Sequence, residues 1–111
     1  MVLCLGLGPG CGLGPRNFRA IAHPAPIVRA RAAGLGEDLP EEMVLPALIA
    51  RLNDSDPVVR LAAHEELRKR TGQDFGYLPW GDAAERGQAI SRWQAWWQQR
   101  RLALARLGQN P

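Results

Sequence analysis

The chain has few serine and cysteine residues, the side chains that hydrolases most often use as nucleophiles. Its 111 residues include two serines, Ser55 and Ser91, and two cysteines, Cys4 and Cys11, both near the N-terminus. Ser55 falls in a turn-like stretch and Ser91 in a surface-patterned helical stretch. A hydrolase needs a nucleophile beside a base, and neither position suggests such a pair. We therefore expect no catalytic residue and no enzymatic activity.

Motifs for metals and cofactors are missing as well. The run that starts at His64 (H-E-E) lacks the second histidine of H-E-x-x-H, so we expect His64 to be a solvent-facing helix residue. Cys4 and Cys11 lack the third and fourth ligands of a zinc site. The N-terminal glycines do not follow the G-x-G-x-x-G spacing of a dinucleotide loop. We predict no metal site and no cofactor.

Long hydrophobic runs are also absent. Residues 1–15 are apolar but short and interrupted by Gly and Pro, too short to span a membrane. The stretch G-P-G-C ending at Cys11 resembles a degenerate bacterial lipobox, although Gly8 stands where Leu is usual. Three alternatives stay open for residues 1–22. They are the remnant of an export signal, with a lipid on Cys11 that tethers the chain to the bacterial cell envelope, or a flexible tail of a cytoplasmic protein, or a segment with a structured role.

What the sequence does contain is helical periodicity. Leu45, Leu48, Ile49 and Leu52 form one apolar stripe. The polar residues 53–56 then break the pattern, and Pro57 suits the first position of a second helix. Gly72 follows a basic last turn and predicts a left-handed stop. Residues 45–72 therefore predict two helices joined by a tight turn.

The spaced residues of this stretch resemble a HEAT repeat. The pattern is L-x-x-L-I-x-x-L-x-D-x-D-P-x-V-R-x-x-A-x-x-x-L, from Leu45 to Leu67. The resemblance implies an α-hairpin that stacks sideways on similar hairpins, with a polar set that ties neighbouring turns together: Asp54, Asp56 and Arg60. We also explain the two carboxylates by helix capping and by pairing with Arg60, in preference to a metal site.

A second, partial copy precedes this hairpin. Pro26-Ile27-Val28-Arg29 matches Pro57-Val58-Val59-Arg60 at an offset of 31 residues, while Gly36 stands at the position of Leu67. We predict helices over residues 26–35, 41–52, 57–71 and 83–107, in one helical domain over residues 23–111. Residues 16–25 are expected to link the N-terminal segment to the body, with Phe18 and Ile21 as an apolar cap on the first helix and His23 as a solvated residue. The predicted fold is all-α, a short α-solenoid fragment.

The C-terminal third holds most of the aromatic residues. Residues 73–83 form a loop whose apolar side chains we expect to fold back over the hairpin: Phe75, Tyr77, Leu78 and Trp80. Asp82 and Glu85 form a capping box that starts the last helix. Ile90, Trp93, Trp97 and Leu104 share one face of that helix. We expect loop and helix to cap the repeat, as solenoid ends require.

These features favour a non-catalytic protein-interaction or scaffold module of HEAT-repeat type. The candidate partner surface is Arg92, Trp96 and Arg100, because Trp and Arg are common at protein interfaces. The alternative is a nucleic-acid-associated protein that uses this Arg/Trp-rich helix. A net charge of +3 is far below that of a dedicated nucleic-acid binder, which makes another protein the expected partner.

Overall fold

The computed structural model describes residues 16–109 and places them in helices joined by short connections. A 3-10 helix, η1, spans Phe18–Ala22 and is followed by four α-helices. These are α2 (Pro26–Ala32), α3 (Glu41–Arg51), α4 (Pro57–Thr71) and α5 (Ala83–Gln109). The predicted all-α class and the long C-terminal helix are confirmed.

Local sequence signals set most helix ends. Asp56 caps α4, with its side chain accepting from the N–H groups of Val58 and Val59, and Gly72 ends the same helix at φ 73°. The predicted capping box is present at the start of α5. Asp82 accepts from Glu85 N–H at 2.8 Å, and Glu85 accepts from Asp82 N–H at 3.0 Å.

Three predicted helix ends differ from the structure, the smallest difference being that α3 ends at Arg51, one residue before the predicted end. Helix α2 ends at Ala32 instead of residue 35, because residues 33–35 continue in tighter turns closed by i→i−3 hydrogen bonds such as Leu35 N–H to Ala32 O. Helix α5 continues through Gly108 to Gln109. A glycine costs only about 1 kcal/mol inside a helix, too little to stop one of this length.

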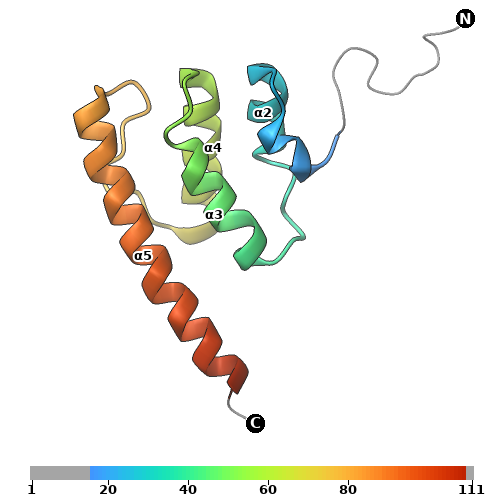
Figure 1. Ribbon diagram of the computed structural model, residues 1–111, viewed down its shortest axis with the longest axis vertical. Helices are drawn as coiled ribbons and strands as arrows, with labels where there is room; N and C mark the ends of the chain where they lie inside the picture. Colours follow the sequence, from blue (N-terminus) through green and yellow to red (C-terminus); the bar gives the residue numbers. More distant parts are fainter. Residues whose placement is uncertain (1–15, 110–111) are drawn as a thin grey trace, which may run out of the picture.

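The α3–α4 hairpin is the centre of the molecule. Helix α2 packs on α4, and α5 packs on α3, so the two lie on opposite sides of the hairpin, as Figure 1 shows. The N-terminal ends of α2, α4 and α5 lie along one edge of the molecule (Figure 1). Because the connection between α4 and α5 crosses back to that edge, α5 runs antiparallel to α3.

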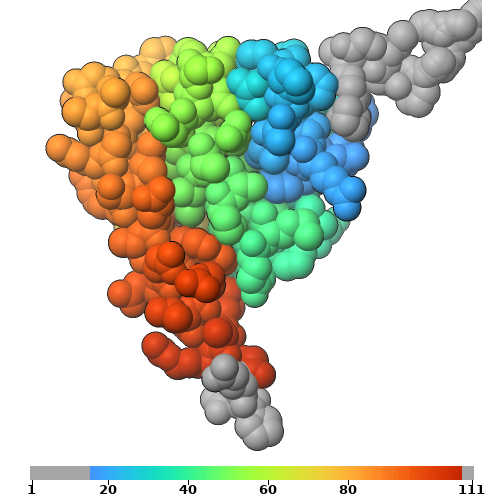
Figure 2. Space-filling view, in the orientation of Figure 1, coloured from blue at the N-terminus to red at the C-terminus, as the bar shows by residue number. Residues whose placement is uncertain are grey.

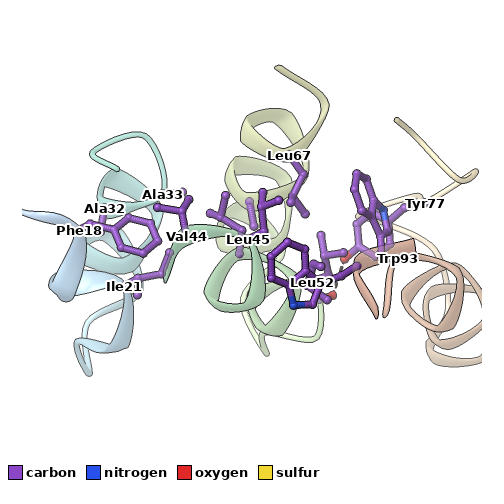
Figure 3. Close-up of a cluster of buried hydrophobic side chains, with 14 of the residues drawn as sticks. Phe18, Ile21, Ala32, Ala33, Val44, Leu45, Leu52, Leu67, Tyr77 and Trp93 are labelled. Atoms are coloured by element: carbon purple, nitrogen blue, oxygen red, sulfur yellow. Dashed lines mark hydrogen bonds between the residues drawn. The ribbon is translucent and has the colours of Figure 1, made fainter. Parts of the chain in front are cut away.

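The buried side chains form one continuous band from η1 to α5. Figure 3 shows it running from Phe18 and Ile21, through Val44 and Leu45, to Trp93. Trp93 is fully buried and Trp97 nearly so. The prediction that both tryptophans lie on the inner face of the C-terminal helix is confirmed.

The folded part begins ahead of residue 23, the predicted start of the domain. Phe18, Ala20 and Ile21 are buried, and η1 packs on α2. The expectation that Phe18 and Ile21 form an apolar cap on the first helix is confirmed, and η1 belongs to the folded part. The reason is the small Gly36, whose buried backbone leaves room for the Phe18 ring: a Cβ at Gly36 would lie 2.9 Å from Phe18 Cδ1.

This contact predicts a penalty for any side chain at residue 36. We expect Gly36→Ala to lower the free energy of unfolding by about 1–3 kcal/mol, because the added methyl overpacks the Phe18 ring. Gly34→Ala is the matched control, since its Cβ would have its nearest neighbour at 3.9 Å. Urea unfolding of the two variants measures the difference. Equal effects would show that η1 is not docked on the body.

Candidate functional site

Asp54, in the turn between α3 and α4, is the most heavily bonded carboxylate. Its buried side chain accepts from Arg29 Nε at 2.8 Å and Nη2 at 2.9 Å, from Arg51 at 3.1 Å, and from Asp56 N–H at 2.9 Å. Burial raises the pKa of Asp54, but the hydrogen bonds from Arg29 and Asp56 lower it by more. Asp54 therefore stays ionised and ties α2 to the turn.

The prediction that Asp54 and Asp56 pair with Arg60 is wrong, because Arg60 does not bond to either carboxylate. Arg60 donates to main-chain carbonyls, at 2.8 Å to Asp54, 3.3 Å to Ser55 and 2.9 Å to Pro79. The physical reason is that other donors already occupy the carboxylates, with Arg29 on Asp54 and the first N–H groups of α4 on Asp56. An Arg–Asp link between neighbouring elements does exist, through Arg29.

Arg29, Arg60 and Arg86 make equivalent hydrogen bonds. Each is the fourth residue of its helix, and each donates from Nη1 to the carbonyl five residues earlier, at 2.8, 3.3 and 2.6 Å. Arg29 and Arg60 also donate to the carbonyl six residues earlier. Buried turn carbonyls need such partners. Arg86 was missed from sequence, although Asp82 to Arg86 repeats the spacing of Asp56 to Arg60.

His64 is buried, so its predicted solvent-facing position is wrong. Its ring lies 4.9 Å from the Tyr77 ring and 6.4 Å from Trp93, measured between centroids. Nε2 is 3.4 Å from the Asp74 carbonyl oxygen. Residues 73–82, which we call the aromatic loop, connect α4 to α5 and cover this face of α4. The sequence of the helix alone does not reveal this. Burial lowers the pKa of His64, partly opposed by the carbonyl and carboxylate of Asp74.

The aromatic loop turns only half of its apolar side chains inward. Tyr77 is buried and its hydroxyl donates to the Leu52 carbonyl, while Phe75 packs edge-on against Trp93 at 4.8 Å. Leu78 and Trp80 are 58% and 64% exposed, so the expectation that they are buried is wrong. Arg60 donates to the carbonyl of Pro79, which lies between Leu78 and Trp80 in the chain.

Exposed apolar side chains gather where α2 and α4 begin. Arg29 holds the start of α2 beside the turn at Asp54, and Arg60 holds Pro79 against the start of α4. The edge formed in this way carries five large exposed side chains, which we call the apolar edge: Ile27, Val58, Leu61, Leu78 and Trp80. Contiguous exposed apolar surface is typical of interaction sites.

The three predicted partner residues lie on α5 but are not equally accessible. Trp96 is half-buried against Phe75 and Trp93, and Arg92 donates to the Phe75 carbonyl at 3.3 Å. Arg100 forms a two-pronged ion pair with Glu41 at 2.8 and 2.7 Å. Trp96 and Arg100 line a surface cleft of about 490 Å³ between α3, α4 and α5. Their role toward a partner stays a prediction.

Residues 16–109 show neither a metal-binding cluster nor a membrane-spanning helix. In this part of the chain, no three His, Cys, Asp or Glu side chains form a group that could hold a metal ion, and no helix is long and apolar enough to cross a membrane. Cys11 and its predicted lipid lie outside the described residues. Comparison of the chain with protein-family models, curated proteins and solved structures found no match.

The Arg29–Asp54 pair is expected to be strongly coupled. The side chains are 11% and 2% exposed, so little solvent screens them. A double-mutant cycle with Arg29→Met and Asp54→Asn should give a coupling free energy of about 1–3 kcal/mol in urea unfolding. The matched control is Arg100→Met with Glu41→Gln, an exposed pair whose coupling should stay below about 1 kcal/mol. A smaller coupling for the buried pair would refute its role.

His64 should make folding sensitive to mild acid. Its folded-state pKa lies below that of the unfolded chain, so the unfolded chain binds the proton more readily. The contribution of the neutral His64 to the free energy of unfolding is fully present above about pH 6.5. It falls as the pH drops below that value, by at most about 1.4 kcal/mol per pH unit. We expect His64→Gln to remove this slope between about pH 6.5 and 5, measured by urea midpoints. His23→Gln, the other histidine, should retain it.

Proposed function

We propose that the chain is a non-catalytic protein-interaction module of HEAT-repeat type. The first support is the agreement between α2 and α4. At an offset of 31 residues, Arg29 and Arg60 bond to carbonyls at matching positions, His23 and Pro24 in one case and Asp54 and Ser55 in the other. Helix α2 also packs directly on α4. Both are the features expected of stacked repeats.

In this interpretation α5 acts as the cap of the stack. It packs on α3 and runs antiparallel to it, with Trp93 and Trp97 buried on its inner face, whereas a further repeat would begin with a helix parallel to α3. The side of α5 that faces away from the body is polar, with exposed residues such as Gln88, Arg92 and Gln99. A polar outer face at the end of a stack is what solubility requires.

The observation that carries the proposal is the apolar edge. It contains an exposed tryptophan, a residue type that is enriched at protein-binding hot spots, among four exposed aliphatic side chains, and exposed apolar patches are typical of interaction sites. Catalysis lacks comparable support, since within residues 16–109 no hydrogen bond joins a serine to a histidine or a carboxylate. Base stacking is not supported by Trp93 and Trp97, because both face the core. We therefore favour another protein as the partner.

Photo-crosslinking at Trp80 tests the proposal. A photoreactive residue replaces Trp80 in the full chain, expressed in its native cells, and the same residue at the exposed Gln88 of α5 is the control. We expect position 80 to crosslink to a discrete protein that position 88 does not capture. With that protein purified, Trp80→Ala should weaken binding about 30-fold, the effect of losing a hot spot worth about 2 kcal/mol.

Two results would contradict the proposal. One is crosslinking from position 80 to nucleic acid, which would favour the alternative class and should come with a steep loss of binding as salt is added. The other is an identical set of captured proteins from positions 80 and 88. Because Trp80 is exposed, its replacement leaves the core intact, and a circular-dichroism melt checks this.

A further inference from the structure

Helix α5 extends past the end of α3, the helix on which it packs. Arg100 is paired with Glu41, the first residue of α3, so the following residues 101–109 lie beyond the end of α3. At about 1.5 Å per residue this α5 overhang is roughly 13 Å long, and Figure 2 shows it projecting from the lower side of the molecule. Its Leu102 and Leu107 are 50% and 69% exposed.

The charge of the overhang has a single sign. Helix α5 contains no acidic residue after Glu85, and its overhang carries Arg101 and Arg106. Both side chains are exposed, and within residues 16–109 neither forms an ion pair. The overhang is therefore an apolar helical segment with basic flanks.

The opposite chemistry lies next to it. The connection between α2 and α3 and the start of α3 carry exposed Glu37, Asp38 and Glu42, with exposed Leu35 and Met43 among them. We call residues 35–43 the acidic link. Apart from Glu41, its carboxylates form no ion pair in the described part of the chain. In Figure 2 the link (teal) and the overhang (red) lie near each other on the lower side.

We propose that the overhang of one copy binds the acidic link of a second copy, and the reverse, in a two-fold dimer. In such a dimer both contacts are the same, because each copy offers both surfaces. Leu102 and Leu107 would cover Leu35 and Met43, while Arg101 and Arg106 would meet Glu37, Asp38 and Glu42. The intramolecular Arg100–Glu41 pair shows the same chemistry where the two segments already touch.

Charge decides between this pairing and simpler ones. Two overhangs packed against each other would bring arginines together, and two links would bring carboxylates together, both of which are unfavourable. The overhang cannot reach its own link beyond Arg100, because α5 is straight and leads away from the body. The contact surfaces are small, so we expect a weak, salt-sensitive dimer. This dimer uses a different end of the molecule from the apolar edge, so either proposal can fail alone.

A charge-reversal exchange tests the dimer in the full chain. One variant carries Arg101→Glu and Arg106→Glu, and the other carries Glu37→Lys, Asp38→Lys and Glu42→Lys. Sedimentation velocity over a range of concentrations should show that each variant alone dimerises about tenfold or more weakly than the wild type. An equimolar mixture should recover dimerisation, because both contacts are then complementary, and native mass spectrometry should find mixed dimers. Arg16→Glu with Arg19→Glu controls for net charge and should dimerise normally.

Other occupants of the overhang would give different results. A wild-type chain that stays monomeric at every concentration overturns the proposal, as does dimerisation that neither reversal changes. Binding to anionic vesicles by a monomeric chain, lost with Arg101→Glu and Arg106→Glu, would assign the overhang to a membrane surface instead. All exchanged side chains are exposed, and circular-dichroism spectra of the variants check that the fold is kept.

Discussion

The structure depends on one recurring interaction, an arginine at the fourth position of a helix that closes the turn before it. A tight connection between helices leaves carbonyls pointing into a region where water has little access, and these must be satisfied. A guanidinium presents five donors in a rigid planar fork. Arg60 can therefore bond to Asp54 and Ser55 behind it while still reaching Pro79 in the next connection. The single ammonium group of a lysine could not bond at once to the carbonyls of the turn before α4 and to the carbonyl of Pro79.

This interaction explains why so small a chain is well packed. The same fork on Arg29 spans from the turn before α2 to the carboxylate of Asp54 in the α3–α4 turn, so Arg29 and Arg60 each join the turn before their own helix to a connection farther along the chain. The apolar band from Phe18 to Trp93 then fills the space between helices whose ends are already fixed. Hydrophobic burial provides the larger driving force for folding. The hydrogen bonds of the arginines fix how the helix ends are arranged.

Local signals in the sequence predicted the helices well, but contacts between segments far apart in the sequence could not be predicted from it. The Asp56 cap, the Gly72 stop and the Asp82–Glu85 box each depend on residues within one turn, so their spacing was sufficient. The partner of Asp54 was not predictable in this way, because Arg29 lies 25 residues away and competes with the nearer Arg60. His64 shows the same limit. His64 is buried because residues 73–82 pass over it, and the pattern of apolar residues in α4 does not predict that path.

The path of residues 73–82 also determines both surfaces for which we propose binding. By crossing back along the hairpin, with Tyr77 bonded to Leu52 on the way, this connection brings Trp80 to the edge where α2 and α4 begin. The same crossing reverses α5, so Arg100 pairs with Glu41 at the acidic start of α3 and the basic turns that follow project past it (Figure 1). Had α5 run parallel to α3, its overhang would project from the apolar edge instead. A single anchored loop thus separates an apolar end of the molecule from a charged one.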